Sequence, residues 1–336
     1  MAISSKTYIQ ESLAQFKRDG RDDMKNLGEA KSPLDENSDP ECDESPLLDA
    51  YGRRAYQRYI GIAVWVVQLG RIDCCYATQI LGRFSNAPRE GHMRAMRRFF
   101  GYLKKYPSKC IVINPTPIQD LPEVESNQKQ KLGLAYPWAQ EERSEREPEP
   151  LGDAIPLVGL VDASHANDKI DYRSVTGLLL FLGSTPIQWR SKRQNTTAGS
   201  TFEAEYIAYR QAVDEIKATR FLMRSLGLLV EDATPLYGDN LGMIQNVYQY
   251  KSPLKKKHLA ICYHRCREAI AAGIIAAGKI DTDLNLSDIL TKSLSGPKLA
   301  LLADALIPRR SQTQLVLAKA KSAPSHTVEP KGSVTV

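Results

Sequence analysis

The second half of the sequence predicts an α/β fold, a mixed β-sheet flanked by helices, with a small helical domain in front of it. From residue 156 onward, apolar runs bounded by turn residues alternate with longer amphipathic stretches. Their order is three strands, a helix, a strand, one or two helices, a strand and a final helix, which is typical of a sheet covered by helices. Residues 53–106 instead carry consecutive helical patterns, and these predict the helical domain.

The composition fits a soluble globular protein of about two domains. The 336 residues are 42% hydrophobic and 25% charged, and the formal net charge is +6. A basic excess of this size favours a polyanionic partner but does not select one. The six cysteines form no C-x-x-C pair. We therefore expect a reducing compartment in which the cysteines serve as small buried apolar side chains.

No segment predicts membrane insertion or secretion. The longest apolar run, residues 59–69, is well short of the roughly 20 residues that a helix needs to cross a bilayer. The N-terminus, M-A-I-S-S-K-T-Y-I-Q, lacks the apolar core of a signal peptide. We therefore expect a protein that is neither secreted nor bound to a membrane.

Changes in composition and hydrophobic pattern divide the chain into five segments. The first holds a short helix and a polar connector, the second is helical, the third is a polar and partly disordered linker, the fourth is the α/β domain and the last is a disordered tail. The predicted boundaries are 1–52, 53–106, 107–155, 156–307 and 308–336. Strands are expected at 157–164, 176–183, 186–191, 235–239 and 274–281, and helices at 201–226, from 241, from Pro253 to about 272, and up to 307.

The helix expected from Arg89 to Lys105 has an apolar side and a basic side. The apolar side carries Met93, Met96, Phe100 and Leu103 at helical spacing. The remaining surface carries the basic residues Arg94, Arg97, Arg98, Lys104 and Lys105. Two interpretations stay open: a face that follows the phosphates of a nucleic acid, or an ordinary solvated face.

Hydrolysis of a phosphodiester by two metal ions requires several carboxylates to converge on ions about 4 Å apart. Asp162 ends the apolar strand 157–161, where an acid has no obvious structural role, although a turn-forming aspartate is an alternative. Asp239 ends the strand 235–238 and Asp288 begins a helical segment. The alternative for each of these two is a helix N-cap.

Helical geometry separates two glutamates near residue 200. Ser200 and Glu203 fit a capping box, in which Glu203 reaches back to the backbone of Ser200. The residues at helical spacing from Glu203 are charged, and we expect them to face solvent. Steps from Glu205 meet the small and apolar residues Ala208, Tyr209, Ala212 and Ile216. We therefore predict that Glu205 faces the sheet and that Glu203 serves as the cap. The ordered set Asp, Glu, Asp, Asp is a stronger signal than any one of its members.

The motifs around these acids resemble the ribonuclease H region of copia-type LTR retrotransposon Pol polyproteins. The resemblance covers residues 156–295 and rests on V-D-A-S-H-A-N-D-K, R-S-V-T-G-L-L-L-F-L-G, S-T-F-E-A-E-Y-I-A, G-D-N, K-K-K-H and N-L-S-D-I-L-T-K-S-L. Upstream, R-R-A-Y-Q-R-Y-I-G and F-G-Y-L-K-K-Y-P resemble the thumb- or connection-like segment that follows the reverse-transcriptase palm. The resemblance of residues 156–295 to the ribonuclease H region implies a ribonuclease H-like five-stranded mixed sheet with helices on both sides. It also places the catalytic, metal-holding carboxylates at Asp162, Glu205, Asp239 and Asp288.

The resemblance implies metal-dependent endonucleolytic cleavage of the RNA strand of RNA–DNA hybrids during reverse transcription. The implied cofactor is a pair of Mg²⁺ ions, for which Mn²⁺ can substitute, and the implied partners are the hybrid and the palm and fingers of the parent polyprotein. The implied location is a cytoplasmic retroelement particle or the nucleus. The chain would be the C-terminal piece of a polyprotein or a truncated copy.

The chain departs from the family pattern at three places. The family often has tryptophan at the position of His165 and aspartate at that of Ala260. No Y-V-D-D-like polymerase motif occurs, so we expect no DNA polymerase activity of this chain alone. A non-catalytic remnant that binds nucleic acid therefore remains an alternative. An integrase or transposase of related fold would need the acids in the order Asp, Asp, Glu, which is not the order found.

A second group of polar and basic residues are candidates for contact with the hybrid. Lysine and arginine side chains hold the phosphate backbone without reading its sequence, and hybrids are recognised by shape and by their 2′-hydroxyls. The alternative for each is a solvated surface charge. The candidates beyond Arg94, Arg97 and Arg98 are Arg173, Lys192, Arg193, Asn240, Lys255, Lys256, Lys257 and His258. A zinc site on His258, Cys262 and Cys266 is disfavoured because one helical stripe cannot supply tetrahedral ligands.

Overall fold

The computed structural model describes residues 1–18, 24, 26–125, 127–230, 232–249 and 257–308. The predicted tail, apart from Pro308, and the predicted contacts Lys255 and Lys256 lie outside the described residues. A five-stranded sheet forms the centre of the C-terminal half, with strand order β5-β4-β3-β6-β7. Its strands are β3 (Leu157–Ser164), β4 (Val175–Leu182), β5 (Thr185–Arg193), β6 (Thr234–Gly238) and β7 (Ile275–Lys279).

The sheet is mixed, as its connections require. Strand β4 runs antiparallel to both β3 and β5, and short connections join these three strands. Strand β6 is parallel to both β3 and β7, and helices provide these crossovers. The predicted fold class, an α/β architecture with a five-stranded mixed sheet flanked by helices, is confirmed.

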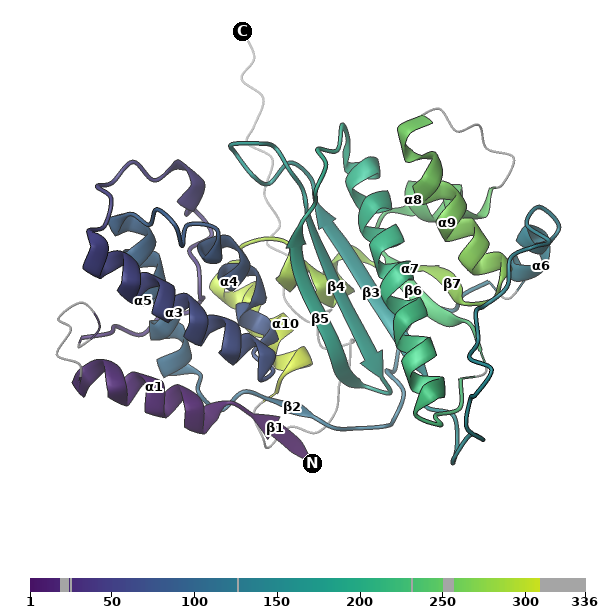
Figure 1. Cartoon of the computed structure of the whole chain (residues 1–336), viewed down its shortest axis with the longest axis horizontal. Coiled ribbons are helices and arrows are strands. Elements are labelled where there is room, and N and C mark those ends of the chain that lie inside the picture. Colours follow the sequence, from purple (N-terminus) through teal and green to yellow (C-terminus); the bar gives the residue numbers. More distant parts are fainter. Residues whose placement is uncertain (19–23, 25, 126, 231, 250–256, 309–336) are drawn as a thin grey trace, which may run out of the picture.

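Helices cover both faces of the sheet (Figure 1). The alternation along β3 explains why: Leu157 and Val161 join the core under α7, whereas Val158 and Leu160 join the core on the opposite face. One face is covered by α7 (Thr201–Ser225), α8 (Leu241–Tyr248), η3 (Lys257–Leu259) and α9 (Ala260–Ala271). Opposite them lie η4 (Thr282–Leu284), η5 (Leu286–Leu290) and α10 (Gly296–Leu306).

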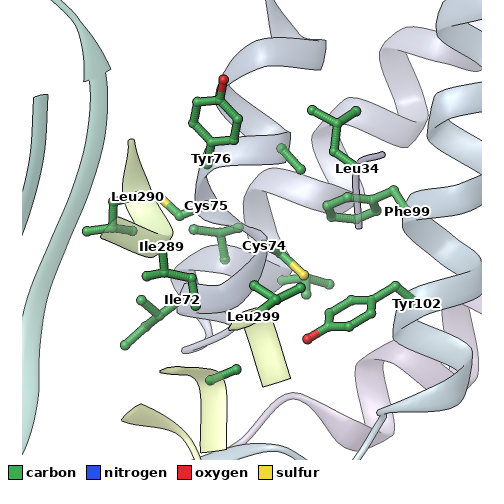
Figure 2. Packing of buried hydrophobic residues seen from close by; sticks show 14 of the residues in the cluster. Leu34, Ile72, Cys74, Cys75, Tyr76, Phe99, Tyr102, Ile289, Leu290 and Leu299 are labelled. Atoms are coloured by element: carbon green, nitrogen blue, oxygen red, sulfur yellow. The ribbon is translucent and has the colours of Figure 1, made fainter. Parts of the chain in front are cut away.

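The N-terminal helices share a hydrophobic core with that second face. Figure 2 shows Leu34, Cys74 and Phe99 from this region packed around Ile289 and Leu299. The N-terminal elements are β1 (Ala2–Ser4), α1 (Lys6–Arg18), η1 (Pro40–Cys42), α3 (Ala50–Gln68), η2 (Ile72–Cys74), α4 (Cys75–Gly82), α5 (Glu90–Lys105) and β2 (Cys110–Val112). Strand β1 pairs antiparallel with β2. None of the helices in the described ranges has the length and apolarity to span a bilayer.

The segment 107–155 packs more closely than its polar composition indicated. Helix α6 (Gln128–Gly133) places Leu132 in the core of the α7 face, and Tyr136 is buried beside it. Farther along, Glu141 accepts hydrogen bonds from Arg220 Nε at 2.7 Å and from Arg224 Nη2 at 2.8 Å. Buried apolar residues and the ion pairs of Glu141 with Arg220 and Arg224 therefore hold the described part of this segment against the α7 face.

Candidate metal centre and nucleic-acid surface

Asp162 lies on the central strand of the sheet and is 3% exposed. Its register partner on β4 is Gly177. A Cβ at Gly177 would lie 2.6 Å from Thr291 Cγ2 and 2.9 Å from Leu290 Cβ, so glycine allows the chain after η5 to approach the sheet. As a result, the hydroxyl of Thr291 donates a hydrogen bond to Oδ2 of Asp162.

Glu205 lies in the second turn of α7 and is also 3% exposed. The start of the helix resembles the predicted capping box with a shift: Ser200 Oγ accepts from the Glu203 backbone, but the Glu203 carboxylate accepts from Gly199 rather than from Ser200. Glu203 is only 5% exposed, so it does not lie on the solvent face predicted for it. Oε2 of Glu205 is buried and has no hydrogen-bond partner among the described residues.

Asp239 follows the end of β6 and completes a cluster with Asp162 and Glu205. Carboxylate oxygens of the three residues all lie within 4.8 Å of one another. Oxygen donors are the ligands that Mg²⁺ accepts, and the unpartnered buried oxygen of Glu205 is the kind of atom that a cation would satisfy. The three residues therefore fit a divalent cation.

The electrostatics of the cluster also fit a cation. Burial, and next the charges of Asp162 and Asp239, raise the pKa of Glu205 to about 9. Burial and the charge of Asp288 raise the pKa of Asp162 to about 6, against the lowering effect of Thr291 and Lys292. The raised pKa values mean that the protonated forms of Glu205 and Asp162 are favoured when no cation is bound. A bound cation would favour their ionised forms.

Asp288, the fourth predicted metal ligand, takes a different set of partners. Its buried carboxylate lies 2.8 Å from Lys292 Nζ through Oδ1 and 2.9 Å from Lys298 Nζ through Oδ2. The group of converging ligand atoms, as far as the structure describes the chain, contains Asp162, Glu205 and Asp239 but not Asp288. The motif D-I-L-T-K carried a signal for this pairing, because acid and lysine four residues apart are standard ion-pair spacing.

The two aspartates for which N-caps were an alternative are not caps. Asn240 Oδ1 caps α8 by accepting from Met243 N at 2.9 Å. The side chain of Asn285 caps η5 by accepting from Ser287 N at 3.2 Å. Asp239, which precedes Asn240, and Asp288, which lies inside η5, are thereby left for other interactions. The predicted nucleic-acid contact Asn240 already has a structural role.

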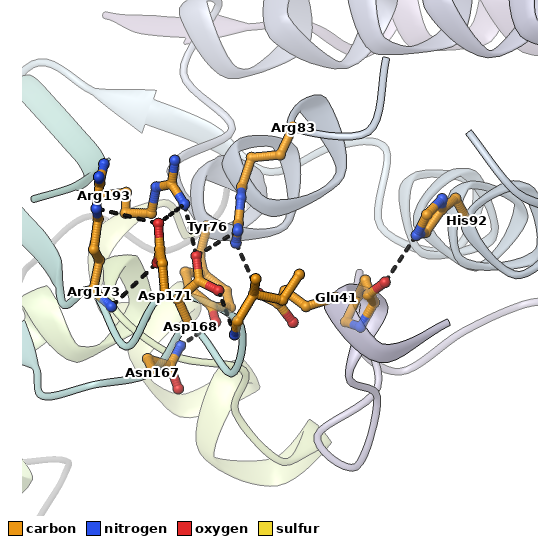
Figure 3. Close-up of polar contacts among 11 residues, drawn as sticks. Glu41, Tyr76, Arg83, His92, Asn167, Asp168, Asp171, Arg173 and Arg193 are labelled. Carbon is orange, nitrogen blue, oxygen red and sulfur yellow. Dashed lines mark hydrogen bonds and ion pairs between the residues drawn. The ribbon is translucent and has the colours of Figure 1, made fainter. Parts of the chain in front are cut away.

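Two of the predicted basic contacts are engaged inside the protein. Arg193 Nη1 lies 2.8 Å from both Asp168 Oδ2 and Asp171 Oδ2, and Arg173 Nε lies 3.2 Å from Asp171 Oδ2. Figure 3 shows this network on the connection between β3 and β4. Lys192, next to Arg193 on the edge strand β5, is exposed.

The basic face of α5 is partly covered by the acidic connector. Arg98 lies 3.0 Å from Asp35 and donates to Ser32 Oγ at 3.1 Å. Arg94 is exposed and Arg97 is half-buried. Among the three arginines of this face, Arg94 is therefore the most open to a partner.

The remaining candidates lie at the start of α9. His258 is exposed, with Nε2 3.3 Å from Glu203 Oε1, and Lys257 begins η3. His258, Cys262 and Cys266 form no metal-ligand group in the described ranges. His165, one of the departures from the family pattern, is exposed and its Nε2 lies 3.1 Å from the carbonyl oxygen of Ala198.

Comparisons with known proteins place these observations in a family context. No family model matches the chain. It is 28% identical over 228 residues to the retrovirus-related Pol polyprotein from transposon RE1 of Arabidopsis thaliana, which covers 67% of this chain and 13% of that protein. It is 25% identical over 304 residues to the corresponding polyprotein from transposon TNT 1-94 of Nicotiana tabacum, covering 89% of this chain and 20% of that protein.

These relatives, together with the one from transposon RE2 of Arabidopsis thaliana, are retrovirus-related Pol polyproteins. The resemblance to copia-type Pol stated from the motifs is confirmed. The chain spans between 13% and 20% of the length of these relatives. Among solved structures, LC11-RNase H1, isolated from compost, aligns with 40% of this chain and 92% of its own at 15% identity and a TM-score of 0.31.

One buried acid of this Pol-like chain gave no signal in the sequence. Asp168 is 2% exposed and accepts hydrogen bonds from Arg83 at the end of α4 and from Arg193 on β5. Asn167, beside it, donates to Tyr76 Oη at 2.6 Å. The loop after β3 thus ties the N-terminal helices to the sheet near Asp162 (Figure 3).

Proposed function

We propose that the chain acts as a metal-dependent ribonuclease H that cleaves the RNA strand of RNA–DNA hybrids. The observation that carries the proposal is the convergence of carboxylate oxygens of Asp162, Glu205 and Asp239 within 4.8 Å. These residues come from a central strand, the helix that crosses it and the end of the neighbouring parallel strand. The homology to Pol polyproteins supports the same class of function.

In this proposal the three carboxylates hold the cation and Thr291 fixes the orientation of Asp162 through its hydrogen bond. The bound divalent cation, Mg²⁺ or Mn²⁺, supplies charge stabilisation at the scissile phosphate and lowers the pKa of a water molecule. Burial of Asp162 and Glu205 keeps bulk water from competing for their oxygens. The product ends would be a 3′-hydroxyl and a 5′-phosphate.

The exposed Lys192 and Arg94 are the proposed contacts to the hybrid's phosphates. Such contacts position a duplex without selecting its sequence, and the 2′-hydroxyls would distinguish the RNA strand. Because the relatives are much longer Pol polyproteins, we also propose that the palm and fingers of a parent polyprotein are partners. The proposed setting is a cytoplasmic retroelement particle or the nucleus.

The test is cleavage of a labelled RNA–DNA hybrid with Mg²⁺, with Mn²⁺ and with EDTA. The wild-type chain should cut with either cation and lose activity in EDTA. Asp162→Asn should abolish cleavage while leaving the fold and hybrid binding nearly intact. Asp214→Asn is the matched control, because Asp214 pairs with Arg210 on the surface of α7 and should leave cleavage unchanged. Equal cleavage by wild type and Asp162→Asn would refute the proposal.

A second candidate is a non-catalytic remnant that binds hybrid without cutting it. The observation that favours it is that Asp288 forms ion pairs with Lys292 and Lys298 and does not join the ligand group of the other three acids. Binding of hybrid by the wild-type chain without cleavage in either cation would support this candidate.

A further inference from the structure

The connection between β3 and β4, residues 165–174, displays two large apolar side chains to solvent. Tyr172 is 62% exposed and Ile170 is 65% exposed. No hydrogen bond or ring contact joins the side chain of Tyr172 to the rest of the described chain. Packing into the core therefore does not explain the presence of these two side chains.

The backbone at Tyr172 adopts a conformation that a bulky side chain disfavours. Its φ is 53°, in the left-handed region, where a residue with a Cβ persists only when the surrounding structure imposes it. Tyr172 N donates to the carbonyl oxygen of Asp168 at 2.8 Å, and Asp168 N donates to that of Arg173 at 3.2 Å. Glycine would adopt this conformation without strain. The tyrosine ring is therefore present at a position where it opposes folding.

Ion pairs hold the tip of this connection in a fixed position (Figure 3). Arg193 on β5 binds both Asp168 and Asp171, and Arg83 at the end of α4 binds Asp168. The hydroxyl of Thr197, in the segment just before α7, donates to the carbonyl oxygen of Asp171 at 3.4 Å. The tip therefore borders the entry to the helix that carries one acid of the cluster. A side chain displayed on a braced loop loses little freedom when it binds a partner.

The charges of the tip are mostly paired, which bears on the kind of partner. Arg173 Nε lies 3.2 Å from Asp171 Oδ2, and Lys169 Nζ lies 2.5 Å from Asp39 Oδ2. The tip therefore offers an aromatic face and an aliphatic side chain rather than unpaired charge. Aromatic side chains stack on nucleic-acid bases of any sequence. Bases inside a duplex are covered by their neighbours, so the faces open to such a side chain belong to unpaired bases.

We infer that Tyr172, flanked by Ile170, is a stacking platform for an unpaired base of a strand that extends beyond the hybrid. The inference goes beyond the proposed function, because it assigns a subsite for single-stranded nucleic acid beside the carboxylate cluster, and it rests on that function only for the attached hybrid. Removal of RNA from a hybrid leaves single-stranded DNA, so the proposed reaction itself produces a strand of this kind.

The test compares hybrids that carry single-stranded DNA with and without its bases. Binding of the full-length chain is followed by fluorescence anisotropy in EDTA, so that the hybrid is not cleaved. The three probes are a blunt hybrid, a hybrid whose DNA strand extends at both ends as thymidines, and the same hybrid with abasic extensions that keep the phosphates. The wild type should bind the thymidine probe at least about fivefold more tightly than the abasic probe, the lower end of what one stacked base contributes.

Tyr172→Gly should abolish this preference without harming the fold. Its melting temperature should equal that of the wild type or exceed it by up to about 3 °C, because relief of the left-handed backbone offsets the extra freedom of glycine in the unfolded chain. Tyr172→Trp should keep the preference. Stacking involves no phosphate, so Tyr172→Gly should leave the slope of log affinity against log salt unchanged.

The matched control is Ala166→Gly in the same connection. Ala166 also has a positive φ, 50°, but carries no aromatic ring. Its replacement by glycine should affect the melting temperature as Tyr172→Gly does and should leave the preference for thymidine extensions as in the wild type.

Equal affinity of the wild type for the thymidine and abasic probes overturns the inference. So does a Tyr172→Gly variant that keeps the preference or melts well below the wild type, and so does an equal loss of affinity for blunt and extended hybrids, which would place Tyr172 against the duplex. Cleavage of hybrid without a base preference removes the inference and leaves the proposed function standing. A base preference that Tyr172→Gly loses, in a chain that does not cleave, keeps the inference and removes the nuclease. Absence of binding to all three probes overturns both.

Discussion

The hydroxyl of Thr291 donates a hydrogen bond to the carboxylate of Asp162, although the two residues are 129 positions apart. This bond links the chain after η5 to the central strand, and it is possible because Gly177 leaves space on the neighbouring strand. The placement of Asp288 and Lys292 beside the cluster therefore depends on packing at a glycine that carries no functional group.

Gly177→Ala should loosen this attachment. Its added Cβ would lie 2.9 Å from the carbonyl oxygen of Ser287 and 2.6 Å from Thr291 Cγ2, closer than real contacts allow. We expect a loss of about 1–3 kcal/mol in the free energy of unfolding, as for other overpacked sites, together with weaker Mn²⁺ binding. Urea unfolding and metal titration measure the two effects.

The control for this variant is Gly61→Ala. Gly61 lies inside α3, and a Cβ there meets nothing within 4 Å in the part of the chain that the structure describes. Alanine should be neutral or stabilise by up to about 1 kcal/mol through helix propensity. If both alanine variants behave alike, the packing explanation for Gly177 is wrong.

Two glutamates on α7 should respond in opposite ways to replacement by glutamine. Glu205 is buried beside Asp162 and Asp239, which together with burial raises its pKa to about 9. Glu205→Gln should therefore stabilise the metal-free chain at neutral pH while abolishing metal binding and cleavage. Glu203→Gln weakens the bond to the Gly199 backbone, so we expect a loss of roughly 1 kcal/mol or less, as at other helix caps, with metal binding kept.

Thermal melting in EDTA and Mn²⁺ titration distinguish these outcomes. A Glu205→Gln variant that melts lower than wild type in EDTA would contradict the electrostatic description of the cluster. Retention of full metal affinity in that variant would remove Glu205 from the centre.

The sequence indicated the burial of Glu205 but not that of Glu203. Helical steps of three and four residues indicated that Glu205 faces the sheet, because such periodicity is local. The buried carboxylate of Glu203 lies 3.3 Å from Nε2 of His258, which is far along the chain. Local periodicity carries no information about such a contact.

The same limit applies elsewhere in the chain. The succession of strands and helices along the chain followed from the apolar runs, whereas the order β5-β4-β3-β6-β7 within the sheet was not predicted from them. The contact between Arg83 and Asp168, 85 positions apart, and the docking of Leu132 into the core had no local pattern behind them. The pairing of Asp288 with Lys292 was visible at four-residue spacing, but the distant Lys298 was needed to complete it.

Replacing two neighbouring basic residues on β5 should have different effects, one on hybrid binding and the other on the free energy of unfolding. Lys192 is exposed, and Lys192→Ala should weaken hybrid binding with little effect on unfolding. If it contacts one phosphate, the slope of log affinity against log salt should fall by about one. Fluorescence anisotropy at several salt concentrations measures this slope.

Arg193→Ala should mainly destabilise the fold. Its guanidinium group bonds the buried Asp168, and loss of a partner for a buried charge costs about 1–3 kcal/mol or more. The two-residue comparison is decisive: loss of hybrid affinity in Arg193→Ala at unchanged stability, or a destabilised Lys192→Ala, would reverse the assigned roles.

Acid should release the segment that Glu141 holds against α7. Burial alone would raise the pKa of Glu141, but hydrogen bonds and charges from Arg220 and Arg224 outweigh it and lower the pKa to about 2. Because the folded-state pKa is depressed, the stabilisation is fully present above the ordinary value of 4.5 and is lost as the pH falls towards 2. The contribution at neutral pH is about 3 kcal/mol at most.

Urea unfolding between pH 7 and pH 2.5 measures this loss, and limited proteolysis with pepsin reports whether residues 107–155 open first. Glu141→Gln should lower stability at pH 7 and flatten its decline with acid. The neighbouring Glu142 is exposed, so Glu142→Gln should leave both the neutral value and the decline as in the wild type. An equally steep decline in Glu141→Gln would mean that another carboxyl group governs acid unfolding, and that the contact with Arg220 and Arg224 does not hold this segment in place.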